Sequence, residues 1–133
     1  MKYLYYKLWQ CFKRIPTNDM PATNAMFFLC MCQSANFFVI HIILATYSIV
    51  PFNFNSKTEI YGFSILIFSI LTLLNYLFLY KKRDKIYDKY KDESKKQKLI
   101  GNILLILYIV GSFALVFYFG PKYTSSIAAM HTP

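Results

Sequence analysis

Three long runs of apolar residues alternate along the chain with short polar segments that carry nearly all of its charge. The uncharged runs cover residues 25–50, 60–80 and 99–119, and the spans predicted from them are 25–50, 59–80 and 95–119. A helix needs roughly 20 mostly apolar residues to cross the hydrocarbon of a bilayer, and each run is long enough. The pattern therefore predicts an all-α integral membrane protein with three transmembrane helices.

The N-terminal segment, residues 3–15, has a different pattern. On a helical wheel its apolar side chains fall on one half, whereas Lys7, Lys13 and Arg14 fall on the other. The segment is too short and too charged to span a bilayer, but a basic helix with an aromatic apolar face suits the membrane interface. We therefore predict a short amphipathic interfacial helix before the spans. A soluble helix packed on a partner is the alternative interpretation.

Polar segments separate and end the spans. Residues 56–59 read Ser-Lys-Thr-Glu, a capping-box pattern that predicts the start of the second span. Nine basic residues lie between positions 81 and 98, and acidic residues three or four positions from lysines favour helices that continue into water. We expect the second span to extend as a cytoplasmic helix to about residue 91, before a turn at 92–94. Gly120 and Pro121 predict the end of the third span and a loose extracytoplasmic tail over 120–133.

The composition agrees with a membrane protein, because 56% of the residues are hydrophobic and only 16% are charged. The net charge of +9 would suggest nucleic-acid binding in a soluble chain, but here the basic residues flank the spans, so we expect no nucleic-acid partner. Three spans place thirteen Lys and Arg residues on one side and two on the other. The positive-inside rule then predicts a multi-pass plasma (inner) membrane protein with a cytoplasmic N-terminus and an extracytoplasmic C-terminus, with Asn53 and Tyr123 outside.

The basic segments predict contacts at the cytoplasmic face. Lys and Arg beside a span attract anionic lipid headgroups by about 1 kcal/mol per residue. The simpler interpretation is that these basic residues only fix the topology. The more specific interpretation is that they also form a docking platform for a cytosolic partner. The candidate contacts are Lys7, Lys13, Arg14, Lys81, Lys82, Arg83 and Lys85.

Uncharged polar residues interrupt the first two spans. A polar side chain in hydrocarbon needs a partner, so this face should point inward or toward another subunit. Interhelical hydrogen bonding is the structural interpretation, and a pore or a binding site lined by Gln33, Asn36 and His41 is the functional one. The candidate intramembrane polar face comprises Gln33, Ser34, Asn36, His41, Ser64, Thr72 and Asn75.

The sequence carries no recognisable catalytic or metal-binding pattern. His41 could relay protons, but no carboxylate lies deep in a span to accept them. The two histidines and three cysteines do not reach a metal-ligand spacing. Neither a Gly-x-Ser-x-Gly motif nor a phosphate-binding glycine loop is present. We therefore predict no enzyme activity, no cofactor and no metal.

Two functional hypotheses remain open. The first is a non-enzymatic subunit or scaffold in a membrane complex, in contact with the lipid bilayer and with either further copies of itself or a larger membrane protein. The second is a homo-oligomeric pore or membrane-disrupting effector lined by the polar face of the first span. They differ in where that face points, toward the chain's own other spans or toward a shared axis.

Overall fold

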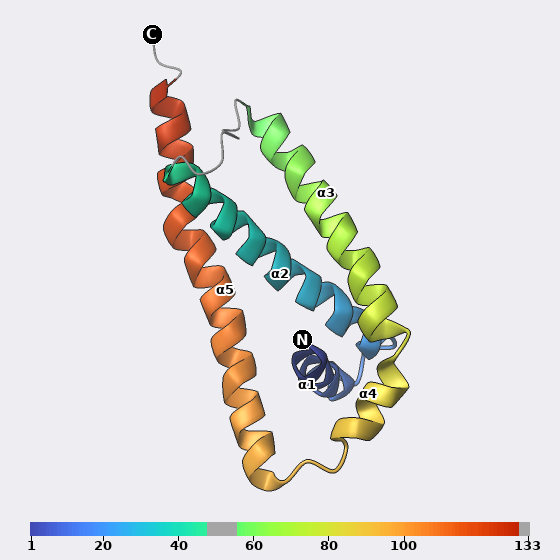
Figure 1. The fold of residues 1–133 in the computed structure, drawn as a ribbon. Helices are drawn as coiled ribbons and strands as arrows, with labels where there is room; N and C mark the ends of the chain where they lie inside the picture. The colour runs from blue at the N-terminus through green and yellow to red at the C-terminus, as the bar shows by residue number, and fades with distance from the viewer. Residues whose placement is uncertain (48–55, 131–133) are drawn as a thin grey trace.

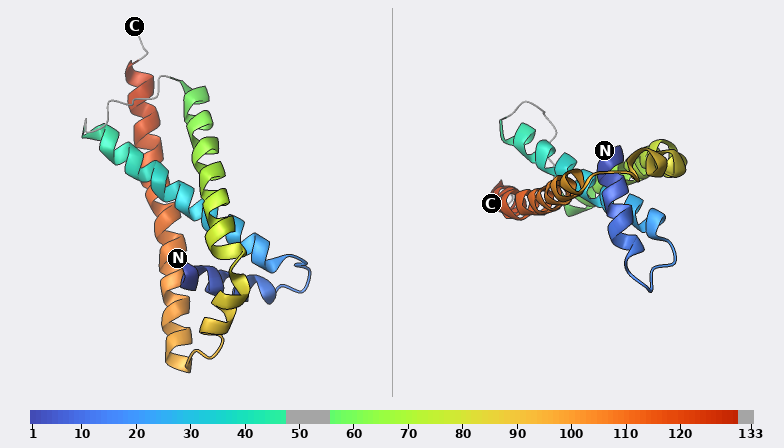
Figure 2. Two further views of the ribbon diagram at one scale, coloured as in Figure 1. Left: turned by 45° about the vertical axis from the view of Figure 1, so that its right-hand side comes forward. Right: turned by 90° about the horizontal axis from the view of Figure 1, so that it is seen from below.

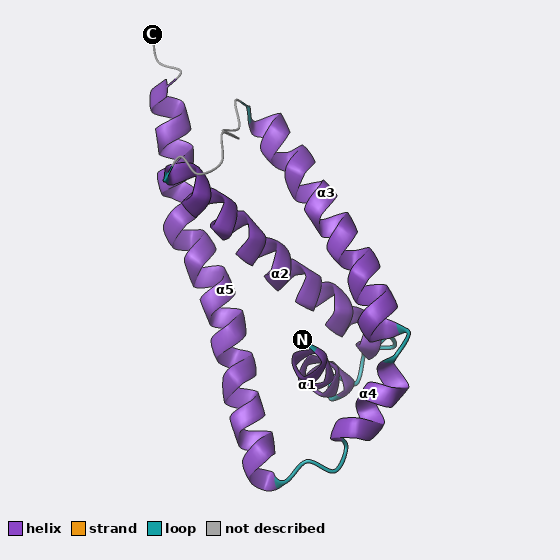
Figure 3. Cartoon of the chain, in the orientation of Figure 1, coloured by secondary structure: helices purple, strands orange, loops and turns teal. Residues whose placement is uncertain are grey.

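The computed structural model describes residues 1–47 and 56–130, and this part of the chain is helical without any strand (Figure 3). Three of its helices are long and apolar enough to cross a membrane, which confirms the predicted all-helical class and the number of span-length helices. The elements are α1 (Lys2–Lys13), α2 (Pro21–Thr46), α3 (Lys57–Asn75), the π-helical turn η1 (Tyr76–Tyr80), α4 (Arg83–Tyr90) and α5 (Lys95–Met130).

α2 is the central element of the fold. It runs diagonally between α3 and α5 and contacts both of them as well as α1 (Figure 1). α1 lies across the end of the molecule at which α2 begins and α3 finishes (Figure 2). The short α4 lies at the same end and contacts α1, so that the N-terminus and the polar connections gather there. The last turns of α5 lie at the opposite end.

Local sequence explains where the three long helices begin. Pro21 occupies the first turn of α2, where its missing N–H and fixed φ are tolerated. Ser56 caps α3, since its side chain accepts a hydrogen bond from the Glu59 N–H at 3.3 Å, as the sequence predicts. Ser94 and Gln97 form a second capping box ahead of α5, with each side chain accepting from the other residue's N–H at 3.3 and 3.0 Å.

The predicted straight extension of the second span is interrupted. In η1 the Lys81 N–H donates to the Tyr76 carbonyl at 2.9 Å, five residues back, and a turn follows at 81–82. α4 then changes direction, as Figure 1 shows. The physical reason is that two apolar side chains of α4 pack inside the fold: Ile86 is buried and Tyr87 packs on α1. This segment therefore folds back onto α1.

The limits of the other two spans also differ from the prediction. The first span begins at Pro21, four residues before the predicted start, while its predicted end at 48–50 and Asn53 lie outside the described residues. α5 continues through Gly120 and Pro121 to Met130, so the predicted loose tail is helical as far as residue 130. Proline costs a helix one backbone hydrogen bond, but α5 is continuous across Pro121.

The buried core lies at the end of the molecule that α1 crosses. Tyr5 and Leu8 of α1 pack with Leu29 of α2, Leu79 of η1 and Leu105 of α5. Farther along, the helices diverge, and only 17% of the apolar stretch of α3 and of α5 is buried, against 33% for α2. Most of the apolar surface of the two outer helices is therefore not covered by the chain itself.

Candidate functional site

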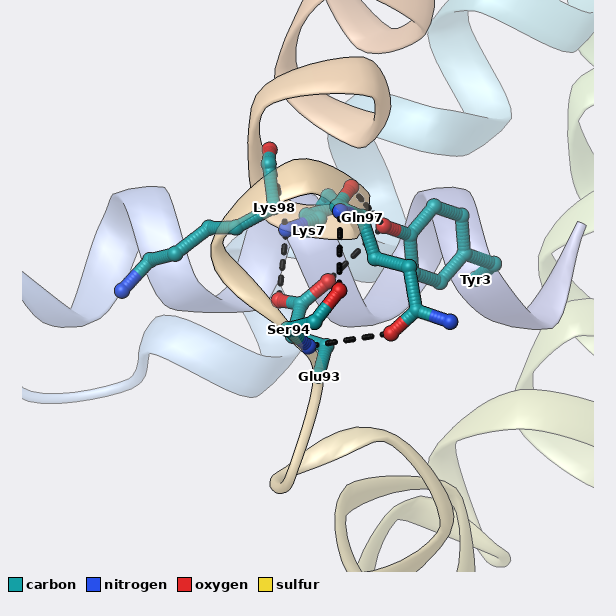
Figure 4. Close-up of polar contacts among 6 residues, drawn as sticks. All are labelled: Tyr3, Lys7, Glu93, Ser94, Gln97 and Lys98. Atoms are coloured by element: carbon teal, nitrogen blue, oxygen red, sulfur yellow. Dashed lines mark hydrogen bonds and ion pairs between the residues drawn. The ribbon is translucent and has the colours of Figure 1, made fainter.

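A buried ion pair fastens α1 to the turn between α4 and α5 (Figure 4). Lys7 is 2% exposed, and its Nζ atom donates to Oε1 of Glu93 at 2.5 Å. The Tyr3 hydroxyl donates to the other carboxylate oxygen, Oε2, at 2.8 Å. The carbonyl oxygen of Gln97 lies 3.0 Å from the same hydroxyl, and that of Lys98 lies 3.5 Å from Nζ. We call Tyr3, Lys7 and Glu93 with these two carbonyls the α1 latch.

Helical spacing and a glycine make the α1 latch possible. Tyr3 and Lys7 are four residues apart, so both side chains leave α1 on one face. Opposite them lies Gly101, one turn into α5 from Gln97, and it is buried. A Cβ atom at Gly101 would overlap the hydroxyl of Tyr3 and the Cε atom of Lys7. Glycine therefore permits a close approach of these two side chains, and a larger residue would have to displace their ends.

The environment of Lys7 differs from the one predicted from the sequence. The helical wheel places Lys7 on the headgroup side of an interfacial helix, whereas the structure turns that side toward Glu93. Glu93, Gln97 and Gly101 were not among the sequence candidates. The usable signal was a capping box at Ser94 and Gln97 directly after the one glutamate of a strongly basic connector. Such a box fixes the backbone of the turn and therefore the position of the Glu93 carboxylate.

Electrostatics keep the Tyr3 hydroxyl protonated. Burial, followed by the hydrogen bond to Glu93 and the charge of that carboxylate, raises the pKa of Tyr3 from 10.0 to about 12. Burial also raises the pKa of Tyr6. The Nζ atom of Lys7 lies 5.4 Å from the ring centroid of Tyr3 and 5.9 Å from that of Tyr6, within cation–π range. The cation is thus surrounded by one carboxylate and two aromatic faces.

An aromatic cluster joins α1 to α4 beside the latch. The ring of Tyr90 lies 5.1 Å from Tyr3, edge to face, and 5.7 Å from Tyr6. The ring of Tyr87 lies 6.2 Å from Tyr6 and 5.6 Å from Trp9. Aromatic pairs at these distances contribute about 0.5–1.5 kcal/mol each beyond their buried area. Together with the latch, they cover the part of α1 around Tyr3, Tyr6 and Lys7, which the sequence assigns to solvent or headgroups.

The polar residues of the first span meet partners on the other two long helices. Asn75 of α3 is 7% exposed, and its Nδ2 atom donates to Oε1 of Gln33 at 2.5 Å and lies 3.1 Å from the Cys30 sulfur. Three residues farther along α2, the Asn36 Nδ2 atom donates to the Tyr108 hydroxyl of α5 at 3.5 Å. These two contacts connect α2 to both of its neighbours.

The remaining polar candidates are not joined into one network. The Ser64 hydroxyl donates to a carbonyl one turn earlier in α3, at 2.8 Å. The hydroxyls of Ser34 and Thr72 are buried and have no hydrogen-bond partner among the residues that the structure describes. The ring of His41 lies 5.2 Å from that of Phe63. Ser34 and Ser64 line one cavity of about 220 Å³ between α2, α3 and α5, whereas Gln33 and Asn36 make separate contacts with α3 and α5.

The other basic candidates lie around the α1 end of the molecule. Lys13, Arg14, Lys81, Lys82 and Lys85 are exposed, and Arg83 is half-buried. Three of them lie over aromatic rings, at 4.7–5.7 Å from the centroid: Lys13 over Tyr87, Lys82 over Phe78 and Arg83 over Tyr80. Except for Lys7, the basic candidates thus remain accessible on this side of the fold.

No group of three His, Cys, Asp or Glu side chains that could hold a metal ion occurs within residues 1–47 and 56–130. No family model matches the chain, and no curated protein or solved structure is significantly similar to it. The class that the fold defines is an all-helical chain with three span-length apolar helices, which suggests a multi-pass membrane protein.

Proposed function

We propose that the chain is a multi-pass plasma-membrane protein that acts as a non-enzymatic subunit or scaffold in a membrane complex. The proposal places α1, α4 and the basic connector in the cytoplasm and the end of α5 outside. Its support is the charge distribution, because thirteen of the fifteen Lys and Arg residues then lie on the cytoplasmic side. A C-terminal reporter that is active only in the cytoplasm would contradict this orientation.

The observation that carries the scaffold proposal is the use of the polar face of α2 within one chain. Gln33 contacts Asn75 of α3, and Asn36 contacts Tyr108 of α5. Such hydrogen bonds contribute about 0.6 kcal/mol on average and hold neighbouring spans together. The same contacts speak against the pore hypothesis, because these amides are engaged inside the chain and are not free to line a conduit between copies.

The outer helices supply the surface for a partner. Leu66 of α3 is 58% exposed and Leu107 of α5 is 62% exposed, and both lie in stretches of which only 17% is buried. Lipid or a second membrane protein would cover these faces. A scaffold would offer them to its partner, while the accessible basic residues of the α1 end would contact headgroups or a cytosolic protein.

Site-specific photocrosslinking tests this function. A photoreactive side chain at Leu66 or Leu107 should crosslink a second polypeptide in native membranes, and mild extraction should give a protein mass above the 15.7 kDa of the chain. The same probe at Leu29, which is fully buried in α2, is the matched control and should crosslink only within the chain. A monomeric mass together with crosslinks to lipid alone would contradict the scaffold.

Membrane potential separates the scaffold from the pore. A scaffold leaves the potential unchanged on overexpression, and the combined change Gln33→Leu and Asn36→Leu has no further effect on it. Depolarisation by the wild-type chain that disappears in this variant would favour a pore lined by α2.

A further inference from the structure

A groove lies between the first half of α2 and the second half of α3. Its volume is about 670 Å³, within the roughly 300–1,000 Å³ of small-ligand sites. Phe27 and Phe68 form part of its wall, with their rings stacked 6.5 Å apart, and Thr72, Tyr76 and Tyr80 continue it toward α4. Aromatic and aliphatic side chains dominate the wall. The groove is thus mostly apolar, with Thr23, Ser69 and Thr72 as its small polar residues, and is suited to a hydrocarbon chain.

The length of the groove corresponds to one leaflet. Phe68 and Tyr80 are twelve residues apart along α3 and η1. At about 1.5 Å per residue this distance is about 18 Å. The hydrocarbon of a bilayer is about 30 Å thick, so one leaflet contributes about 15 Å. An acyl chain that follows the groove would therefore have its headgroup near Tyr80.

Positive charge is concentrated at that end. The Arg83 guanidinium lies 4.7 Å from the ring centroid of Tyr80, which itself stacks on Tyr76 at 5.5 Å. Its neighbour Asp84 is 3.9 Å away with a side chain that is 82% exposed, so solvent screens this ion pair. Positions 81–85 carry four cations and one carboxylate. The first turn of α2, where Thr23 lines the groove, adds the positive end of a helix dipole.

We propose that this groove retains one anionic phospholipid of the surrounding bilayer, with an acyl chain along Phe27 and Phe68 and its phosphate against Arg83. The inference rests on the proposed membrane insertion. An apolar groove alone would accept any lipid. The excess positive charge at its end selects an anionic headgroup, and arginine can bind phosphate through two parallel hydrogen bonds.

Quenching of tryptophan by brominated lipids tests the site in the full-length protein. Trp9 is the only tryptophan, so the background is Trp9→Phe. The reporter is Phe27→Trp in the groove. The matched control is Ile70→Trp, which lies two residues from Phe68 along α3, is 47% exposed and does not line the groove. Each reporter is reconstituted in nanodiscs with dibrominated phosphatidylglycerol or dibrominated phosphatidylcholine over the same series of mole fractions.

The groove reporter should reach half-maximal quenching at about fivefold less phosphatidylglycerol than phosphatidylcholine, the factor that corresponds to about 1 kcal/mol. The control reporter should respond equally to both lipids. Arg83→Gln should abolish the preference, and Arg83→Lys should leave part of it. Lys89→Gln removes an exposed cation from the same helix and should leave the preference intact.

Three results would overturn the site. These are equal quenching of the groove reporter by both lipids, a preference that persists in Arg83→Gln, and a groove reporter that neither lipid quenches while the Ile70→Trp control is quenched. The last result would mean that protein fills the groove. If neither reporter is quenched by either lipid, the membrane insertion itself is refuted, so the two failures are distinguishable.

Discussion

The α1 latch makes a quantitative prediction about helix docking. Lys7 is 2% exposed and the Glu93 side chain 9%, so both charges are largely withdrawn from water. Removing one partner of a buried ion pair costs about 3–5 kcal/mol, because the other charge stays buried without compensation. Lys7→Met should weaken the docking of α1 by about this amount, and Glu93→Leu should do so as well.

The double variant distinguishes this cause from a general loss of packing. Lys7→Met combined with Glu93→Leu removes both charges, and replacing a buried pair by apolar residues is often neutral or stabilising. The double variant should therefore lie within about 1 kcal/mol of wild type, with a coupling energy of several kcal/mol. Lys13→Met, which removes an exposed cation that lies over the Tyr87 ring, is the control and should shift docking by at most about 1 kcal/mol.

Trp9 provides the assay. It is the single tryptophan of the chain, and its ring lies 5.6 Å from Tyr87 of α4. Denaturant titration in detergent, followed by Trp9 fluorescence, measures the free energy of separating α1 from α4. Strictly additive losses in the double variant would refute the reasoning, and so would a Lys7→Met variant as stable as Lys13→Met.

Three further predictions concern neighbouring features, each measured by the same titration. Gly101→Ala should destabilise docking by about 1–3 kcal/mol through overlap with Tyr3, whereas Gly111→Ala, with open space around its Cβ position, should not; equal effects would contradict the close approach. Asn75→Leu should cost the spans about 1–3 kcal/mol by leaving the Gln33 amide unpaired, and an unchanged stability would show that this contact is dispensable. The pKa of Tyr3 is raised in the fold, so the contribution of its protonated hydroxyl to docking is complete below pH 10 and declines as the pH rises toward 12. Tyr3→Phe should show a smaller decline over that interval, and an identical pH profile would contradict the assigned pKa.

Sequence patterns predicted the spans because their signal is local. A run without charges over residues 60–80 predicts a span-length apolar helix by composition and length alone. Capping is equally local, and the predicted start of α3 at Ser56 is confirmed by the hydrogen bond from the Glu59 N–H. The end of α5 was predicted wrongly because proline weakens a helix without having to stop it.

The candidate site was less predictable because its contacts join distant segments. The Lys7 and Glu93 side chains are separated by 86 positions, and a helical wheel contains no information about what will cover either face. The wheel of residues 3–15 correctly separates apolar from basic positions. It could not show that the α4–α5 turn would return over the basic side and supply a carboxylate there.

Burial of the latch also changes which charged side chains are accessible to headgroups or to a partner. An interfacial helix would expose Lys7 together with Lys13 and Arg14, but the ion pair with Glu93 neutralises Lys7 inside the fold. The accessible positive surface is then formed by the end of α1 and by the segment 81–85, which the α1–α4 aromatic cluster holds at one end of the molecule. If α1 undocks, the cluster separates and this surface loses its fixed geometry. The latch therefore acts on headgroup or partner recognition indirectly, by positioning α4, and Glu93→Leu should impair any recognition that depends on Arg83, although the Glu93 carboxylate itself binds Tyr3 and Lys7 of α1.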